Sequence, residues 1–217
     1  MARITIVSSP STWMNKWIPS LVRSWQSDNE VRWLHKASQI EDGDFCFVLS
    51  CLEIIDGPTL AKHKHNLVVH ASALPQGRGM SPMTWQVLEG VNTIPVTLFE
   101  AEEELDSGRI YLQDAIQLEG HELLPELREL LGSTVCRLCQ EFLENHASLV
   151  AAGQAQTGEP TFYGRRRPVD SQLDPRKSLA EQFNLLRIVD NERYPAFFYL
   201  NGHKYILEIR KEGSVDG

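Results

Sequence analysis

The sequence predicts an α/β fold, built on a mostly parallel, twisted sheet with helices on both of its faces. Strand-like and helix-like segments alternate along most of the chain, which is the pattern of such folds. Residues 44–52 (DFCFVLSCL) form a nearly continuous apolar run, as expected of a central parallel strand that is buried on both faces. The last patterned segment, FFYLNGHKYILEI, turns at Asn201-Gly202 and predicts an added β-hairpin.

The first half of the chain supplies most of the predicted sheet. Residues 3–8 (RITIVS) predict the first strand. Tryptophans and leucine then recur at helical spacing, and Pro19 indicates that the regular helix begins near residue 18. The tryptophans are interpreted as core residues rather than as a platform for a ligand. The other elements of this half are expected at residues 31–35 (strand), 44–52 (strand), 58–63 (short helix) and 67–70 (strand).

The segment from 81 to 150 adds two helices. Ser81 is expected to cap the first of them, Pro82 suits its first turn, and Gly90 closes it. Residues 121–150 have a strong helical period and predict one long helix, in which Gly132 marks a bend. Two strands lie between these helices, at residues 95–100 and 109–116.

Residues 151–217 are expected to form a C-terminal extension that packs on the domain formed by residues 1–150. The extension begins with a loop, at 151–177, that contains glycine, proline and arginine. Ser178 and Glu181 form a capping box that predicts the start of a last helix before the hairpin. A chain of 217 residues suits one domain with a small appendage.

Composition argues against several classes of protein. The net charge of −8, from 21 basic and 29 acidic residues, disfavours a nucleic-acid partner, which usually requires a basic stripe. The one dense basic run, Arg165-Arg166-Arg167, suits a diphosphate better than a duplex or a tRNA. No stretch reaches the roughly 18 apolar residues of a membrane helix, and MARITIVSSP lacks the apolar region of a signal peptide. We therefore expect a cytoplasmic protein without a membrane partner.

Two motifs raise the question of a metal site, and neither is favoured. Cys136 and Cys139 form a CxxC inside a helical pattern, with no second CxxC, which is typical of small residues in a helix. His63 and His65 would share one face of a strand, but lysines alternate with them and the segment is interpreted as an exposed loop. The sequence therefore predicts no metal.

A histidine ends one of the predicted strands. The apolar run LVV leads directly into His70, and ligands of open α/β sheets bind at the carboxyl ends of strands. Asp106 lies just before another strand, where Gly108 allows a tight turn. An imidazole beside a carboxylate can stabilise an oxyanion or move a proton. The alternative is a core or surface histidine and an ordinary turn.

The stretches HASALPQGRGMSP and ELDSGRIYLQ together resemble formyltransferases that use 10-formyltetrahydrofolate. That family has a histidine at the end of a strand, a Leu-Pro loop, an Arg-Gly or Lys-Gly pair, and then Leu-Asp-x-Gly or Val-Asp-x-Gly. Here the Leu-Pro and Arg-Gly pairs fall in register between His70 and Asp106. The resemblance extends over about residues 3–120. It implies a Rossmann-like formyltransferase core, with His70 as electrophile and proton shuttle and Asp106 as its partner.

One position departs from the family pattern. The family asparagine, two residues before the histidine, is Val68 here, and valine has no donor for an oxyanion. Asn66 lies roughly 13 Å from His70 along an extended strand, too far to replace it directly. Loss of one oxyanion donor typically lowers a rate on the order of 100- to 1000-fold. Either another group supplies the donor, or the reaction is slow, or the protein only binds.

The tail resembles one branch of the family. TFYGRRRPVDSQLDP and EQFNLLRIVDNERYPAFFYLNG are similar to the tails of sugar formyltransferases, which act on nucleotide-linked amino sugars. MSPMTW and PVTLFEAEEELDSGRIYLQ look most like enzymes of nonulosonic, pseudaminic-type acid pathways. The resemblance implies formylation of a UDP-linked 4-amino-4,6-dideoxy sugar. The alternatives are another amine (an aminoacyl carrier or tRNA), a non-catalytic folate or sugar-nucleotide binding relative, and a hydrolase of formyltetrahydrofolate.

The resemblance also implies which residues bind the two substrates. A nucleotide diphosphate sugar needs cations for its phosphates and an aromatic or apolar slot for its base. We expect the pterin of 10-formyltetrahydrofolate, a co-substrate, in an apolar slot lined by Leu52, Ile54, Ile55, Glu102, Glu103 and Leu105. The residues expected to bind the sugar nucleotide are Ser9, Trp13, Arg78, Gly79, Ser81, Tyr163 and Arg165. The sequence leaves open whether the protein is a monomer or a homodimer.

Overall fold

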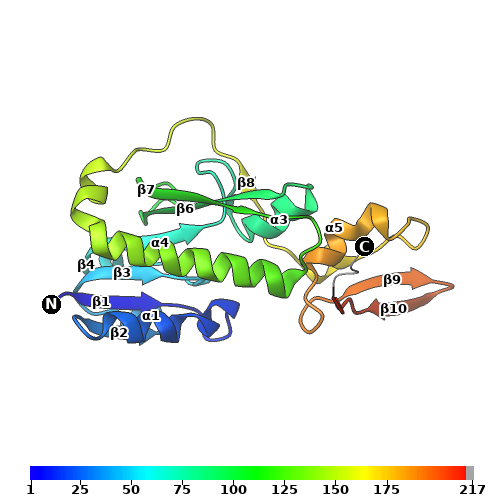
Figure 1. Cartoon of the computed structure of the whole chain (residues 1–217), viewed down its shortest axis with the longest axis horizontal. Helices are drawn as coiled ribbons and strands as arrows, with labels where there is room; N and C mark the ends of the chain where they lie inside the picture. The colour runs from blue at the N-terminus through cyan, green and yellow to red at the C-terminus, as the bar shows by residue number, and fades with distance from the viewer. Residues whose placement is uncertain (214–217) are drawn as a thin grey trace.

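The centre of the protein is a six-stranded sheet in the order β2-β1-β3-β4-β6-β7. The computed structural model describes residues 1–213, and Figure 1 shows the arrangement of its elements. The strands pair in parallel from β2 to β4, and β6 runs antiparallel to both of its neighbours. A mostly parallel α/β sheet is therefore confirmed. Its strands are β1 (Arg3–Val7), β2 (Glu30–Leu34), β3 (Gly43–Val48), β4 (His63–His70), β6 (Thr93–Glu100) and β7 (Ile110–Gln117).

The strand order reverses at β1. The chain passes from β1 to β2 on one side, and β3 pairs with β1 on the other side. At such a switch point the connections run in opposite directions, and this creates a crevice at the carboxyl ends of the strands. Open α/β sheets bind their ligands in this crevice. The loops that follow β1 and β3 therefore border the expected ligand site.

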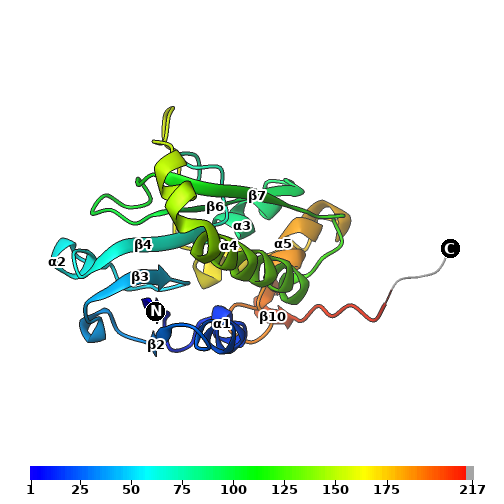
Figure 2. The ribbon, with the colours of Figure 1, turned by 60° about the vertical axis from the view of Figure 1, so that its left-hand side comes forward.

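The two longer helices of the core, α1 and α4, pack with one face of the sheet. Phe47 and Leu67 of the sheet share a buried cluster with Leu21 of α1 and Phe142 of α4. Figure 1 shows α4 in front of the sheet, running roughly along the direction of the strands, and Figure 2 shows the short α2 beside the start of β4. Among residues 1–213, no helix combines the length and apolarity needed to cross a membrane. The helices are α1 (Ile18–Trp25), α2 (Gly57–Leu60), α3 (Pro82–Leu88), α4 (Leu124–Ala152) and α5 (Phe183–Ile188).

Strands β3 and β4 differ from their expected limits. Strand β3 ends at Val48, not at residue 52, because Ser50 adopts a left-handed φ of 54°. Strand β4 begins at His63, so the exposed loop expected for His63 and His65 is wrong. His63 is buried, and its Nε2 lies 3.0 Å from Thr5 Oγ1 on β1. The sheet continues through this polar segment because tertiary burial overrides its lysine-rich sequence.

Two local expectations for the helices are also wrong. Ser81 precedes α3 in a left-handed conformation, with φ 56°, and its side chain forms no cap hydrogen bond in the described structure. The Ser81 carbonyl instead accepts from Thr84. Gly132 lies inside regular α4, where an added Cβ would meet the Trp17 ring at 2.5 Å, so this glycine serves close packing. The irregularity in α4 is at Asn145, whose φ and ψ are −118° and 16°.

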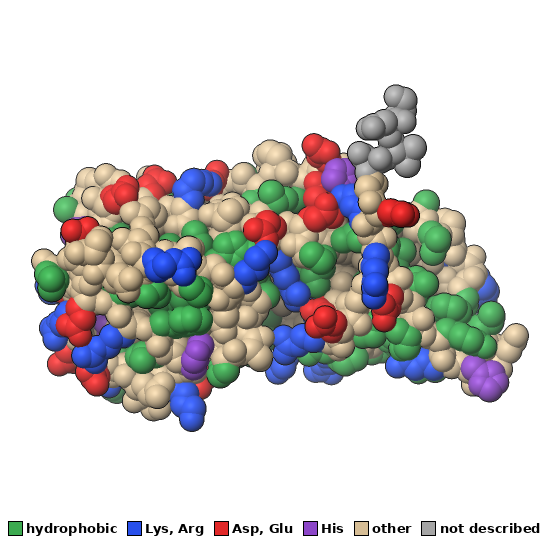
Figure 3. Space-filling view, turned by 60° about the horizontal axis from the view of Figure 1, so that its bottom comes forward, with side chains coloured by type: hydrophobic (Ala, Val, Ile, Leu, Met, Phe, Trp, Pro, Cys, Tyr) green, Lys and Arg blue, Asp and Glu red, His purple; other side chains and the backbone are tan. Residues whose placement is uncertain are grey.

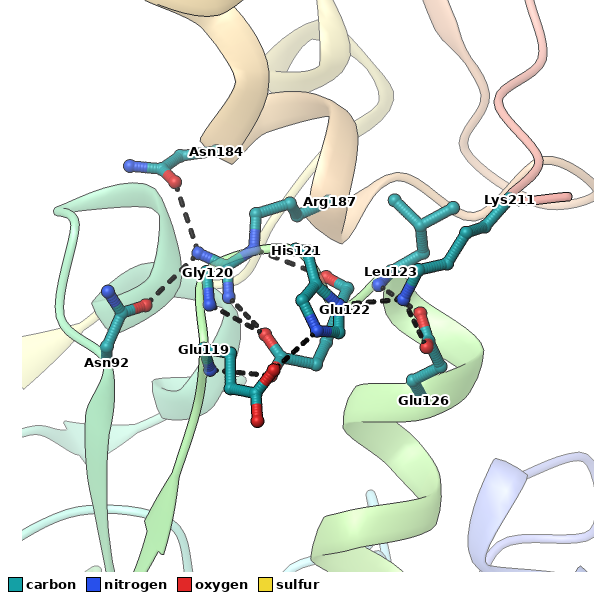
Figure 4. A network of polar contacts seen from close by, with 10 residues as sticks. All are labelled: Asn92, Glu119, Gly120, His121, Glu122, Leu123, Glu126, Asn184, Arg187 and Lys211. Atoms are coloured by element: carbon teal, nitrogen blue, oxygen red, sulfur yellow. Dashed lines mark hydrogen bonds and ion pairs between the residues drawn. The ribbon is translucent and has the colours of Figure 1, made fainter. Parts of the chain in front are cut away.

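The C-terminal extension is tied to the core by a buried ion pair, Arg187–Glu122 (Figure 4). Arg187 Nη2 lies 3.0 Å from Glu122 Oε2, and the two side chains are 1% and 8% exposed. Burial acts to raise the pKa of Glu122, but hydrogen bonds from backbone N–H groups, including those of Glu119 and Gly120, outweigh it and lower that pKa. The ionised carboxylate is thus stabilised where α5 meets the start of α4.

The C-terminal extension includes a hairpin that lies at one end of the molecule (Figure 1). Its strands are β9 (Ala196–Leu200) and β10 (His203–Leu207), joined at Asn201-Gly202 as predicted. One side packs on α5 through Ala196 and Phe198. Tyr199 and Ile206 of the hairpin are exposed. Figure 3 shows apolar side chains gathered at one end of the molecule. The capping box of Ser178 and Glu181 is also present, and it precedes a 3-10 turn that leads into α5.

Replacing Arg187 by methionine is expected to lower the free energy of unfolding by about 3–5 kcal/mol, because it leaves the buried Glu122 carboxylate without its cation. Urea unfolding measures the change. The control is Arg210→Met, which removes the exposed partner of Glu208 and should cost less than about 1 kcal/mol. Equal losses in the two variants would contradict a structural role for the buried pair.

Burial lowers the pKa of His63, and Asp42 and Asp44 oppose this shift only in part. The unfolded chain, with a histidine pKa of about 6.5, therefore takes up this proton first as the pH falls. The contribution of neutral His63 to stability is present above about pH 6.5 and is lost below it. Urea unfolding between pH 7 and 5 should show a shallower loss in His63→Gln than in wild type. His203→Gln, on the exposed hairpin, should keep the wild-type slope; a wild-type slope in His63→Gln would refute the prediction.

Candidate active site

The candidate active site lies at the carboxyl end of β4, around His70. Val69 packs with the α4 side of the sheet, so His70 points to the opposite face. The ring is buried, and its Nε2 lies 2.8 Å from the Gly77 carbonyl oxygen. Because a carbonyl oxygen only accepts hydrogen bonds, Nε2 carries the proton in this arrangement. The backbone of the following loop therefore sets both the orientation and the tautomer of the imidazole.

Asp106 reaches the same place from the loop between β6 and β7. Its Oδ2 accepts a hydrogen bond of 2.8 Å from the Gly79 N–H and lies 3.9 Å from His70 Nε2. Asp106 adopts a left-handed φ of 53°, which aspartate tolerates better than most residues. The structure thus brings together the two residues that the sequence singled out, at a separation that permits a charge interaction and is too long for a direct hydrogen bond.

The extension contributes one wall of this site. Strand β5 (Arg78–Gly79) pairs in parallel with β8 (Phe162–Tyr163). Gly79 has a φ of 98°, and a Cβ on it would lie 2.4 Å from the Tyr163 carbonyl oxygen. The Tyr163 ring stacks on Trp85 at 6.3 Å, and its hydroxyl donates to Glu89. Burial, together with the hydrogen bond to Glu89, raises the pKa of Tyr163 to about 12, so this phenol stays protonated.

The arginines expected to bind phosphate have different surroundings. Arg78 is buried, and its guanidinium donates to Glu104 at 2.7 Å and to Gln156 at 2.9 Å. This geometry favours a structural role for Arg78 over the expected contact with phosphate. Arg166 donates to carbonyl groups of the extension and lies over the Trp85 ring. Arg165 and Arg167 are both exposed, so these two arginines of the run are open to a ligand.

The loops expected to form the pterin slot lie side by side. The Leu52 N–H donates to Ser9 Oγ at 2.9 Å, which joins the loops after β3 and β1. An added Cβ on Gly57 would lie 2.0 Å from Glu103 Oε1, so the loop after β6 lies against α2. Exposed apolar side chains occur on both loops: Leu52 (68%), Ile54 (87%) and Leu105 (57%). Glu102 is also exposed, whereas Ile55 packs on a small core cluster.

Two further expected residues lie near the switch point and the β4–α3 loop. Trp13 follows the loop after β1, is half-buried, and meets Trp17 edge to face with ring centroids 5.5 Å apart. Ser81 is exposed at the start of α3. Among residues 1–213, no group of three or more histidine, cysteine, aspartate or glutamate side chains is arranged to hold a metal ion.

Val68, at the position of the family asparagine, lies in an apolar row of the sheet. Its partners in register are Val48 on β3 and Phe99 on β6. The Asn66 side-chain amide donates to the Leu60 carbonyl at 2.9 Å, away from His70, so it does not replace the missing donor. The row that contains His70 is polar instead, because Thr97 and Gln113 follow it across β6 and β7.

Gln156 also belongs to the site, although no pattern in the sequence predicts it. Its side chain donates to the carbonyl oxygens of Asp106, at 2.8 Å, and Gly108, at 2.9 Å. Gln156 lies in AAGQAQTGEP, a loop without periodicity or motif, and its partners are about 50 positions away in the sequence. No local signal marks such a residue, because its role exists only after the extension folds back onto the core.

Comparison with known proteins gives this arrangement a context. Residues 15–132, more than half of the chain, match a family model described as formyl transferase. The methionyl-tRNA formyltransferase of Thermodesulfovibrio yellowstonii is 29% identical over 145 residues, which are 66% of this chain and 47% of the relative. The chain thus spans about half the length of that curated relative.

Solved structures share the fold over nearly the whole chain. The methionyl-tRNA formyltransferase from Clostridium thermocellum superposes with a TM-score of 0.82 and 20% identity, covering 99% of this chain and 96% of that one. A 4-N formyltransferase from Francisella tularensis gives 0.78 and 14%, covering 98% and 99%. HypX from Aquifex aeolicus, in complex with tetrahydrofolic acid, gives 0.77 and 18%, covering 96% and 37%. At these identities the likeness establishes the fold.

Replacing Gly79 by alanine is expected to lower the free energy of unfolding by about 2 kcal/mol, because the new methyl group meets the Tyr163 carbonyl and φ is positive. Thermal or urea unfolding measures the loss. The matched control is Gly164→Ala, because a Cβ there meets no described heavy atom within 4 Å. That control should change stability by less than about 0.5 kcal/mol. A Gly79→Ala protein as stable as the control would contradict the close approach of β5 and β8.

Proposed function

Because this chain belongs to the formyl transferase family, we propose that it transfers a formyl group from 10-formyltetrahydrofolate to a primary amine. The observation that carries the proposal is the convergence of His70 and Asp106, 3.9 Å apart although they are separated by 36 positions in sequence. Both belong to the segment that matches the family model. The loop after β4 holds both residues, because its Gly79 N–H donates to Asp106 and its Gly77 carbonyl accepts from His70.

The proposed reaction proceeds through a tetrahedral adduct. The amine attacks the formyl carbon, the carbonyl oxygen becomes an oxyanion, and the amine loses a proton. The bond from carbon to N10 of the folate then breaks, N10 takes up a proton, and the products are the formamide and tetrahydrofolate. A cationic imidazole is suited to stabilise the oxyanion through its Nδ1–H, because its Nε2–H donates to the Gly77 carbonyl. Asp106 is suited to orient the imidazole and to accept a proton, directly or through water. The His70 and Asp106 side chains are only 10% and 9% exposed, and burial of this degree strengthens charge interactions because less water screens them.

The exposed apolar side chains of the two neighbouring loops support a folate co-substrate. Leu52 and Ile54 follow β3, Leu105 precedes Asp106, and all three are more than half exposed. Apolar groups gathered beside a polar site are typical of a surface that a ligand covers. In this proposal the pterin binds between these loops, and N10 with its formyl group lies at the His70 side of the slot.

The acceptor in this proposal is the amine of a nucleotide-linked sugar, with a UDP-linked 4-amino-4,6-dideoxy sugar of a nonulosonic, pseudaminic-type pathway as the leading substrate. Tyr163 lies beside Gly79, and the exposed Arg165 follows it by two residues. An aromatic ring and a cation in this order suit a base and a diphosphate. Solved relatives with the same fold include a 4-N formyltransferase.

A second candidate acceptor is the aminoacyl group of a tRNA. It is favoured by the relatives described as methionyl-tRNA formyltransferases. The net charge of −8 disfavours it, because binding a tRNA relies on neutralising phosphates.

Incubation with 10-formyltetrahydrofolate and a panel of UDP- and dTDP-amino sugars is expected to add one formyl group to one sugar, detected by mass spectrometry. His70→Ala should lower the turnover rate at least about 100-fold, because the oxyanion loses its donor. His203→Ala, on the exposed hairpin, is the control and should retain the wild-type rate. Methionyl-tRNA is tested in parallel.

Val68→Asn is the informative second variant. If the oxyanion lacks the family donor, this change should raise the turnover rate by at least about tenfold. An unchanged rate would mean that another group already supplies the donor. Folate binding without formylation of any sugar would refute the sugar acceptor, and formylation of methionyl-tRNA alone would establish the second candidate.

A further inference from the structure

Gln156, in the C-terminal extension, makes three hydrogen bonds around the Asp106 loop. Its amide nitrogen donates to the carbonyl oxygens of Asp106 and Gly108, and its amide oxygen accepts from Arg78 Nη2 at 2.9 Å. The chemistry of the partners fixes this orientation of the amide. Carbonyl oxygens only accept hydrogen bonds and a guanidinium only donates them, so the flipped amide would lose all three.

These bonds act on the part of the loop that is under conformational strain. Asp106 is a non-glycine residue with a φ of 53°, a conformation that costs free energy and persists only where its surroundings enforce it. Gln156 binds the carbonyl of this residue and that of the residue two positions later, and so spans the turn. Asp106 in turn directs its carboxylate to the Gly79 N–H and to His70.

Arg78 completes the network by joining it to both sides of the site. Its guanidinium is buried and bridges Gln156 to Glu104, which lies in the same loop as Asp106. Arg78 is also the residue before Gly79 and pairs with the extension through β8. A shift of Gln156 would therefore move both the Asp106 carboxylate and the Gly79 N–H that donates a hydrogen bond to it.

We propose that Gln156 is a positioning residue, which holds Asp106 in the left-handed conformation that places its carboxylate between Gly79 and His70. This inference rests on the proposed formyl transfer for its effect on rate. The C-terminal extension thereby supports the loop of Asp106, and a residue outside the segment that matches the family model controls the geometry of the pair inside it.

Two nearly isosteric variants separate the donor role of Gln156 from its bulk. Gln156→Glu keeps an oxygen for Arg78 but turns a carboxylate oxygen toward two carbonyl oxygens, and Gln156→Met keeps the volume without hydrogen bonds. Both should lower kcat about 10- to 100-fold, because a small displacement of a reacting group has an effect of this size. The KM values for folate and acceptor should stay within about threefold. Gln154→Met, the same substitution at an exposed position two residues earlier, should leave kcat and KM unchanged.

Hydrogen exchange at the Gly79 amide gives a readout that does not require activity. This N–H is protected by its bond to Asp106 in the wild type. It should exchange at least about tenfold faster in both Gln156 variants and at the wild-type rate in Gln154→Met, at matched global stability measured by urea unfolding.

The outcomes distinguish this inference from the proposed function. Faster exchange in the Gln156 variants, in a protein that formylates no acceptor, would support the positioning role while the proposed function fails. Unchanged Gly79 exchange and unchanged kcat in both variants would overturn the positioning role. A rise in KM at constant kcat would also overturn it, because it would assign Gln156 to substrate binding.

Discussion

The return of the loop after β6 across the sheet is the constraint on which the site depends. Strand β6 ends beside the middle of β4, where the Ala101 N–H donates to the Asn66 carbonyl. Asp106 reaches His70, at the far end of β4, only because the loop folds back over the sheet face. Gly108 makes this possible, because a Cβ there would lie 1.9 Å from the Glu100 carbonyl oxygen. A side chain at that position would displace the loop and separate the carboxylate from the imidazole.

The extension stabilises that loop and is itself held by buried charge. At one end, Gln156 and β8 contact the site directly. At the other end, Arg187 of α5 inserts its guanidinium against Glu122, at the start of α4. The Arg187–Glu122 pair anchors the part of the extension that follows Gln156 and β8 in the chain. The stability of the extension is therefore coupled to the geometry of His70 and Asp106. A buried ion pair is costly to break from one side, which makes this anchor sensitive to single substitutions.

Two rows of side chains cross the sheet at the candidate site, one through His70 and one through Val68, and they differ in polarity. The row of His70 continues into Thr97 and Gln113 and is polar, which suits a reacting centre. The row of Val68 continues into Val48 and Phe99 and is apolar, where the family places an asparagine. An amide in that row would lie between two apolar neighbours on adjacent strands. The substitution therefore changes both the hydrogen-bonding capacity beside His70 and the polarity of the adjoining surface.

Local patterns in the sequence were sufficient to identify the strands of the central sheet, the long helix, the Asn201-Gly202 turn and the Ser178–Glu181 capping box, because each depends on side chains only a few residues apart. The short strands β5 and β8 lie in segments that were expected to be loops. The pair of His70 and Asp106 was also found, through a linear motif that preserves their spacing. The burial of Arg78, the start of β4 at His63, and the bonds of Gln156 were not foreseen. Each depends on partners from distant segments, and hydrogen-bond partners of that kind exist only once packing excludes water and fixes the backbone around them.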